Sequence, residues 1–154
     1  MTFTNDYFMK IALREATLAA EENEIPVGAV IVRENNIIAK AHNQVERLRD
    51  ATAHAEMIAL TQAFNAVGDR RLNECTMFVT LEPCAMCAGA MALARLKCVV
   101  FGTRDWQQGG TLSNFGIVQF PKNIHKVEVI EGIMEEECKR LLDEFFTKMR
   151  GKDF

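Results

Sequence analysis

Apolar residues along the chain follow two periods, one helical and one typical of strands. Helical spacing marks segments with apolar residues three or four positions apart, and short β-branched runs mark strands. The predicted helices cover residues 5–22, 53–67, 83–95 and 132–150, and the predicted strands cover residues 26–33, 37–42, 76–80, 98–102 and 127–130. The turn at residues 34–36 joins the first two strands, so these strands predict a β-hairpin.

Residues that favour helix ends support these boundaries. Thr4 or Asn5 can cap the first helix, and Thr52 can cap the second, which stops at Gly68. Pro83 suits the first position of the third helix, because a helix leaves that N–H unpaired in any case. An apolar stripe on the last helix comprises Met134, Cys138, Leu141, Leu142, Phe145 and Phe146.

This order of elements predicts an α/β fold, specifically a three-layer α/β/α sandwich with a mixed five-stranded sheet. The hairpin is antiparallel, whereas helices that link strands favour parallel pairing. A length of 154 residues indicates a single domain over residues 1–154. Residues 103–124 lack a clear period, and a loop this long inside a compact domain is usually functional or mobile.

Composition narrows the class of protein. The chain is 49% apolar and 25% charged, which is typical of globular domains and excludes a disordered or coiled-coil chain. It has no apolar run of membrane-spanning length, and charged residues interrupt residues 1–15, so we expect neither a membrane protein nor a signal peptide. The expected compartment is the cytoplasm. A net charge of −3 restricts nucleic-acid binding to a local site, and we expect no DNA partner.

Two short motifs carry the candidate chemistry. His54 and Glu56 open the second predicted helix, and Cys84 and Cys87 open the third. Cysteines three positions apart share one face of a helix, whose N-terminal end favours the thiolate. Two thiolates and an imidazole suit Zn²⁺, and three protein ligands leave the fourth position open for water. Glu56 can take a proton from that water, so the pattern predicts a hydrolytic zinc centre.

A structural zinc site would instead require a fourth protein ligand. The chain offers His42, Cys75, Cys98 and His125 as candidates. Cys75 and Cys98 stand where strands begin, and Cys138 lies on an apolar helical stripe, so each is expected to be a small buried residue. We expect His42 and His125 to be ordinary surface or loop histidines. An odd count of five cysteines argues against a disulfide framework.

The pattern H-x-E…P-C-x-x-C is the signature of zinc-dependent deaminases. Within that class the chain resembles the bacterial tRNA-specific adenosine deaminases, which convert adenosine to inosine at the wobble position of an anticodon. The matching segments are PVGAV at 26–30, HN at 42–43, TAHAE at 52–56, VTLEPCAMCAGAM at 79–91, VVFGTRD at 99–105 and the EGI…EC…L…FF pattern over 131–146.

The resemblance implies a cytidine-deaminase-like fold, a homodimer and a tRNA anticodon stem-loop as the partner. It implies one zinc ion per subunit, held by His54, Cys84 and Cys87, with Glu56 moving protons to N1 of adenine and to the departing ammonia. The implied substrate contacts are Asn43, Val27, Ala55, Pro83, Arg104 and Asp105.

Some features match the family less well or allow two interpretations. Residues 106–120 differ from the relatives' segment, which leaves tRNA choice open. Trp106 could stack on an RNA base or anchor a core or interface, and Arg104 and Asp105 could form a surface ion pair. The basic residues Lys139, Arg140, Lys148, Arg150 and Lys152 could hold phosphates or complement the helix dipole.

Two other functions remain open from the sequence. A deaminase of a free base or nucleoside, of guanine or cytosine type, would use the same zinc chemistry and fits the net charge of −3. A catalytically silent zinc module that binds RNA is the third possibility. Glu56 argues against that module, because a structural zinc site needs no carboxylate to move protons.

Overall fold

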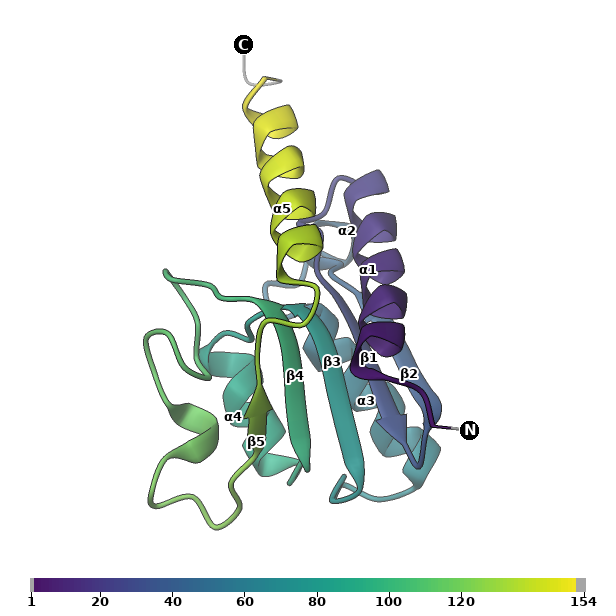
Figure 1. Cartoon of the computed structure of the whole chain (residues 1–154), viewed down its shortest axis with the longest axis vertical. Coiled ribbons are helices and arrows are strands. Elements are labelled where there is room, and N and C mark those ends of the chain that lie inside the picture. The colour runs from purple at the N-terminus through teal and green to yellow at the C-terminus, as the bar shows by residue number, and fades with distance from the viewer. Residues whose placement is uncertain (1, 152–154) are drawn as a thin grey trace.

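The structure is a computed structural model that describes residues 2–151 of the chain. The described residues form one five-stranded sheet in the order β2-β1-β3-β4-β5, with helices on both faces (Figure 1). The elements are α1 (Asn5–Glu21), β1 (Gly28–Arg33), β2 (Asn36–His42), α2 (Val45–Leu48), α3 (Ala55–Val67), β3 (Cys75–Leu81), α4 (Ala85–Leu93), β4 (Cys98–Thr103), the 3-10 helix η1 (Ile117–Gln119), β5 (Glu128–Ile130) and α5 (Glu135–Arg150).

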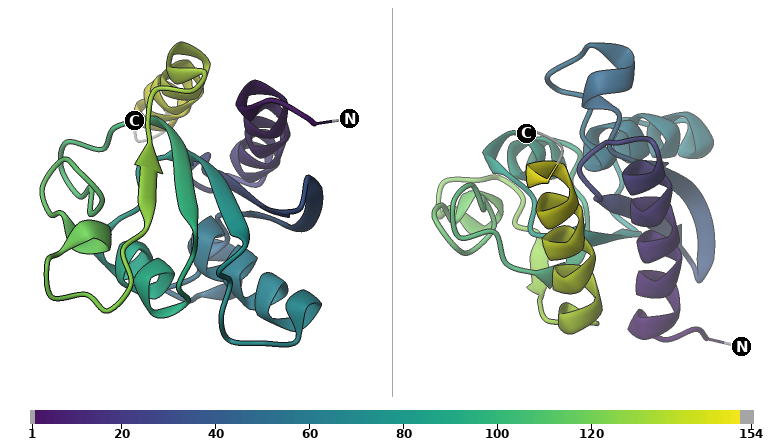
Figure 2. Two further views of the ribbon diagram at one scale, coloured as in Figure 1. Left: turned by 60° about the horizontal axis from the view of Figure 1, so that its bottom comes forward. Right: turned by 90° about the horizontal axis from the view of Figure 1, so that it is seen from above.

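The predicted three-layer architecture with a mixed sheet is confirmed. Strand β1 pairs antiparallel with both β2 and β3, whereas β3, β4 and β5 run parallel. Helices α1 and α5 cover one face of the sheet, and α3 and α4 cover the other (Figure 2). The parallel strands β3 and β4 end at the same edge, from which the site segments continue.

The strands alternate their side chains between two apolar layers. On β1 and β3, Ile31 and Met77 pack toward α3 and α4, whereas Val30 and Phe78 pack toward α1. At Gly28 the backbones of β1 and α1 are so close that a Cβ atom would lie 1.9 Å from a carbonyl oxygen of α1. Only glycine permits this approach, which fixes the start of β1.

Helix boundaries differ from the predictions at both metal-ligand motifs. Helix α3 begins at Ala55 with His54 in the N-cap position, so Thr52 is not its cap. The Thr52 N–H and hydroxyl instead donate to the Asp50 carboxylate, at 2.8 and 2.7 Å. Likewise α4 begins at Ala85 with Cys84 in the N-cap position, and Pro83 precedes it.

The other predicted boundaries lie within two residues of the observed ones except at the last helix; for example, β1 begins at Gly28 rather than Pro26 and α4 ends at Leu93 rather than Arg95. Thr4 caps α1 by accepting a hydrogen bond from the Tyr7 N–H, as one of the two predicted choices. Helix α5 begins at Glu135 rather than Gly132, because Met134 adopts a left-handed conformation with φ of 56°. The stripe on α5 buries Cys138, Leu142 and Phe145.

Two short helices of the structure were not predicted from the sequence. Helix η1 lies within residues 103–124, and α2 follows the hairpin. The buried Glu24 carboxylate caps α2 by accepting hydrogen bonds from the Glu46 and Arg47 N–H groups, at 3.0 and 2.8 Å. Because Glu24 lies 22 residues before Glu46 in the chain, the sequence next to α2 did not reveal this cap.

The predicted burial of the remaining cysteines is confirmed, since Cys75, Cys98 and Cys138 are each at most 5% exposed. Lys148 and Arg150 lie in the last turn of α5, where they complement the helix dipole, and Lys152 lies outside the described residues. Among the described residues, no helix is both long enough and apolar enough to cross a membrane.

Candidate metal centre and substrate pocket

Three candidate ligands meet where two helices begin. His54 precedes α3, Cys84 precedes α4, and Cys87 lies in the first turn of α4. The His54 Nδ1 atom is 3.5 Å from the sulfur of Cys84 and 3.5 Å from that of Cys87. The three ligand atoms all lie within 4.8 Å of one another, and within the described residues no other His, Cys, Asp or Glu joins this group.

This donor set fits a zinc ion. Tetrahedral zinc with Zn–N and Zn–S bonds of about 2.0 and 2.3 Å places its nitrogen and sulfur ligands about 3.5 Å apart. The observed nitrogen–sulfur distances therefore suit one shared ion. His125 lies elsewhere, with its Nε2 atom 2.7 Å from the Leu96 carbonyl oxygen. The group thus offers three protein ligands, as a site with one open position does.

The electrostatics of the metal-free centre favour the thiolate at Cys84 and proton transfer at Glu56, whereas they hold a proton on Cys87 and His54 that a metal must displace. Hydrogen bonds from Cys87 and His54 lower the pKa of Cys84 to about 4, so its sulfur is a thiolate. The hydrogen bond to Cys84 and burial raise the pKa of Cys87, and the hydrogen bond with Cys84 raises the pKa of His54. Burial raises the pKa of the Glu56 carboxyl to about 7, which lets it both take up and release a proton near neutrality.

A cavity of about 150 Å³ opens beside these ligands. It is lined by Ile25, Val27, Asn43, His54, Glu56, Leu81, Glu82, Cys84, Asp105 and Gln108. The structure therefore brings the predicted residues Val27, Asn43 and Asp105 together around His54 and Glu56. The other three predicted contacts are not among its lining residues: Ala55 is 0% exposed within the core, Pro83 stands between Glu82 and Cys84, and Arg104 lines a neighbouring groove.

Comparisons with known proteins agree with this geometry. Residues 3–103 match the family model for the cytidine and deoxycytidylate deaminase zinc-binding region. A tRNA-specific adenosine deaminase of Aquifex aeolicus is 48% identical over 95% of this chain and 96% of the relative. The chain belongs to the tRNA-specific adenosine deaminase family.

Solved structures of deaminases have the same fold. One, from a study of A-to-I editing by tRNA:A34 deaminases at the wobble position, aligns with a TM-score of 0.85 and 38% identity, over 88% of this chain and 99% of that one. A guanine deaminase of Bacillus subtilis aligns with a TM-score of 0.63 and 36% identity, over 66% of each chain. The tRNA enzyme thus matches more of the chain.

In this member of the family, Arg104 and Asp105 do not form an ion pair with each other. Arg104 instead donates two hydrogen bonds of 2.9 Å to the Glu131 carboxylate. Its guanidinium lies 5.0 Å from the centre of the Trp106 ring, which is 70% exposed. Trp106 is therefore no anchor of this chain's core. Arg104, Trp106, Lys139 and Phe146 line a groove of about 580 Å³.

The sequence prediction missed Glu82, a buried carboxylate in the wall of this deaminase's cavity. It stands directly before Pro83 and Cys84, and it accepts hydrogen bonds from Asp105 and from residues 111–113. The only signal available in the sequence was an acidic residue inside the TLEPC motif, with no indication of its partners.

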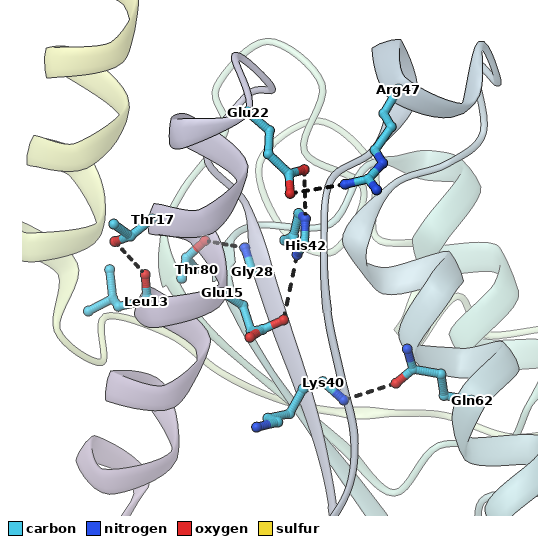
Figure 3. A network of polar contacts seen from close by, with 10 residues as sticks. All are labelled: Leu13, Glu15, Thr17, Glu22, Gly28, Lys40, His42, Arg47, Gln62 and Thr80. Carbon is cyan, nitrogen blue, oxygen red and sulfur yellow. Dashed lines mark hydrogen bonds and ion pairs between the residues drawn. The ribbon is translucent and has the colours of Figure 1, made fainter.

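The expectation that His42 is an ordinary surface or loop histidine is wrong. Its ring lies between the carboxylates of Glu15 in α1 and Glu22 at the C-cap of α1, with Nε2 3.0 Å from Glu22 and Nδ1 3.6 Å from Glu15 (Figure 3). Glu22 also pairs with Arg47 of α2 at 3.2 Å. His42 is only 15% exposed and precedes Asn43, so this network ties α1 and α2 to the strand end that delivers Asn43.

Proposed function

We propose that the protein deaminates adenosine to inosine at the wobble position of a tRNA anticodon. The observation that carries this proposal is the group of His54, Cys84 and Cys87 with the buried Glu56 carboxyl beside it in one small cavity. Membership in the tRNA-specific adenosine deaminase family supports the choice of substrate. The reaction requires water as the nucleophile and a group that moves protons.

Each part of this chemistry has a candidate residue. His54, Cys84 and Cys87 would hold one zinc ion, which when bound supplies a water activated for hydrolysis. Glu56 takes up the two protons of the attacking water in turn and delivers one to N1 of adenine and the other to the departing ammonia, while the water oxygen becomes the carbonyl oxygen at C6. The Glu56 pKa of about 7 suits both steps, because the carboxyl can exist in either protonation state.

The substrate contacts follow from the cavity walls. The Asn43 side chain offers both a donor and an acceptor to the edge of a purine, and Val27 offers an apolar surface to the base. Asp105 lines the cavity itself, and Pro83 stands between Glu82 and Cys84, which both line it. Ala55 is 0% exposed as a whole residue, backbone included, so it supports His54 and Glu56 from within the core rather than offering a surface to the substrate.

The groove beside the cavity supports a polynucleotide rather than a free base. It shares Ile25, Leu81, Asp105 and Gln108 with the cavity and continues past Arg104, Trp106 and Lys139. The groove holds the cations Arg104 and Lys139 beside the anions Asp105, Glu135 and Asp143, so its feature that suits RNA is the exposed Trp106 ring, on which a single-stranded base can stack. A free-base deaminase, the second candidate, has no use for this extension, although the similarity to guanine deaminase favours testing it.

The family also leads us to propose a homodimer that works in the cytoplasm, where tRNA is modified. The outer surface near α4 carries large exposed apolar side chains, with Leu93 82% and Ile124 93% exposed. A surface of this kind fits a subunit interface. Sedimentation should show a dimer that Leu93→Glu dissociates, whereas a monomeric wild-type protein would contradict this part of the proposal.

The decisive experiment offers the zinc-loaded protein several substrates in parallel. The first is an anticodon stem-loop with adenosine at the wobble position, and the others are free adenosine, guanine and cytidine. Inosine in the stem-loop, which reverse transcription reads as G, is the expected result. Release of ammonia from a free base or nucleoside, without inosine in the RNA, would establish the second candidate instead.

A further inference from the structure

Glu82 lies at the centre of a hydrogen-bond network beside the zinc ligands. Its carboxylate is 1% exposed. The Oε1 atom accepts from the Asp105 N–H at 3.0 Å and from the Ser113 hydroxyl. The Oε2 atom accepts from the Thr111 hydroxyl at 3.0 Å and from the Leu112 and Ser113 N–H groups at 2.9 Å. All of these donors belong to one segment of the chain, residues 105–113.

The 105–113 loop is attached to Glu82 at both of its ends and is compact between them. The Asp105 carboxylate accepts hydrogen bonds from the Gln107 and Gln108 N–H groups, each at 3.0 Å. The Gly109 N–H then donates to the Asp105 carbonyl at 2.9 Å. The loop thus holds its own shape, and both of its ends are anchored on one carboxylate.

The same loop lies against the turn that carries the metal ligands. The Gly110 N–H donates to the Pro83 carbonyl at 2.7 Å, and Gly109 forms an antiparallel bridge with Cys84. A Cβ atom at Gly110 would lie 2.7 Å from the backbone of Ala85, which only glycine avoids. The loop therefore forms part of the cavity wall, which Asp105 and Gln108 line together with His54 and Cys84.

We propose that Glu82 is a positioning residue that fixes the 105–113 loop as the outer wall of the substrate pocket. The inference rests on the proposed function, in which this wall meets the RNA. The zinc ligands and Glu56 are held by α3 and α4 instead. Loss of Glu82 therefore weakens substrate binding more than it slows the chemical step.

The test is Glu82→Gln in the zinc-loaded enzyme. The carboxylate of Glu82 has two acceptor oxygens, whereas the amide of glutamine has one oxygen and an NH₂ group that only donates. The N–H and hydroxyl donors that face this NH₂ group therefore lose their acceptor. We expect the KM for the stem-loop to rise about tenfold, while kcat changes less than about threefold, because donors lose partners in the loop alone. The zinc content should remain that of the wild type.

A second readout comes from the one tryptophan of the chain, Trp106, which lies within the loop. In Glu82→Gln without RNA, acrylamide should quench its emission more strongly than in the wild type, because a released loop exposes the ring further. The double variant Thr111→Val/Ser113→Ala keeps the carboxylate and removes both hydroxyl donors. This double variant should raise KM and acrylamide quenching as Glu82→Gln does, but by a smaller amount. If Glu82→Gln does not fold, the double variant alone tests whether Glu82 anchors the loop.

Glu24→Gln is the matched control, because Glu24 is also a buried carboxylate that accepts backbone hydrogen bonds, but it holds α2. It should leave Trp106 quenching unchanged. Lost zinc in Glu82→Gln, a fall in kcat with an unchanged KM, or unchanged quenching would each overturn the proposal. If the wild type does not deaminate the stem-loop, the proposed function fails, and Trp106 quenching still supports or overturns the anchoring by Glu82.

Discussion

The cavity has two walls that are built in different ways. One wall consists of the turns that lead into α3 and α4, where His54, Cys84 and Cys87 take positions set by regular helices on a buried sheet. The other wall is the 105–113 loop, which has no regular structure and depends on hydrogen bonds to Glu82. Both walls border the same cavity.

The two walls serve different tasks: the turns into α3 and α4 carry the residues of the reaction, and the 105–113 loop contacts the substrate. Metal ligands must hold their distances closely, and helix ends packed against a sheet provide that rigidity. A loop tolerates substitution as long as its attachments remain, which suits a surface that selects among RNA sequences. Substitutions in the first wall should therefore abolish turnover, whereas substitutions in the second should alter substrate binding.

The largest effect is expected from Cys87→Ala. Two ligands bind zinc far more weakly than three, so the variant should lose its metal and all activity. It should also unfold at a lower temperature, because zinc stabilises the state that binds it. Metal analysis and thermal unfolding measure both effects. Cys98→Ala is the control, since Cys98 is buried outside the ligand group, and full zinc occupancy in Cys87→Ala would show that the ligand is misassigned.

Glu56→Ala should have the next largest effect and should leave the metal in place. Loss of a positioned proton-transfer group costs about a hundredfold to ten-thousandfold in kcat. Single-turnover rates on the stem-loop give this number, and zinc content is measured in the same sample. Activity retained within about tenfold would remove Glu56 from the proton-transfer role, because the expected loss from such a group is larger.

The first wall could be predicted from the sequence, and the second could not. His54, Cys84 and Cys87 belong to short motifs, H-x-E and C-x-x-C, whose spacing alone predicts a zinc centre. The partners of Glu82, in contrast, lie between 23 and 31 residues away along the chain. Helix α2 escaped detection for the same reason, since its cap, Glu24, is 22 residues from Glu46. The Thr52 and Pro83 predictions shifted because His54 and Cys84 themselves occupy the N-cap positions.

Asn43→Ala tests a residue of the cavity that belongs to neither of these two walls. The side chain is 7% exposed and lines the cavity, so its removal leaves the edge of the purine unpaired. An unpaired buried polar group costs about 1–3 kcal/mol, which predicts a fall in kcat/KM of roughly fivefold to a hundredfold. Zinc content should not change. An unchanged kcat/KM would instead assign Asn43 a purely structural role.

Trp106→Ala should affect only binding. Stacking of a base on an aromatic ring is worth about 1–3 kcal/mol, so the KM for the stem-loop should rise roughly fivefold to a hundredfold with kcat retained. Phe115→Ala is a matched control, since Phe115 is also an exposed aromatic residue, 54% exposed, near the same loop but outside the groove. Equal effects of the two substitutions would contradict a stacking role for Trp106.

The smallest effect concerns stability and belongs to Glu131→Gln. The hydrogen bond from Arg104 lowers the pKa of Glu131 below its ordinary value of 4.5. A carboxyl with a lowered folded-state pKa stabilises the protein above pH 4.5, and this contribution disappears as the pH falls through the folded-state value. Glu131→Gln should therefore be slightly less stable than the wild type at neutral pH and equal to it in acid.

Urea unfolding at both pH values checks this, with the exposed Glu128→Gln as the control. If Glu131→Gln is still less stable than the wild type in acid, the glutamine disturbs packing. In that case the ion pair between Glu131 and Arg104 does not hold Arg104 against the Trp106 ring.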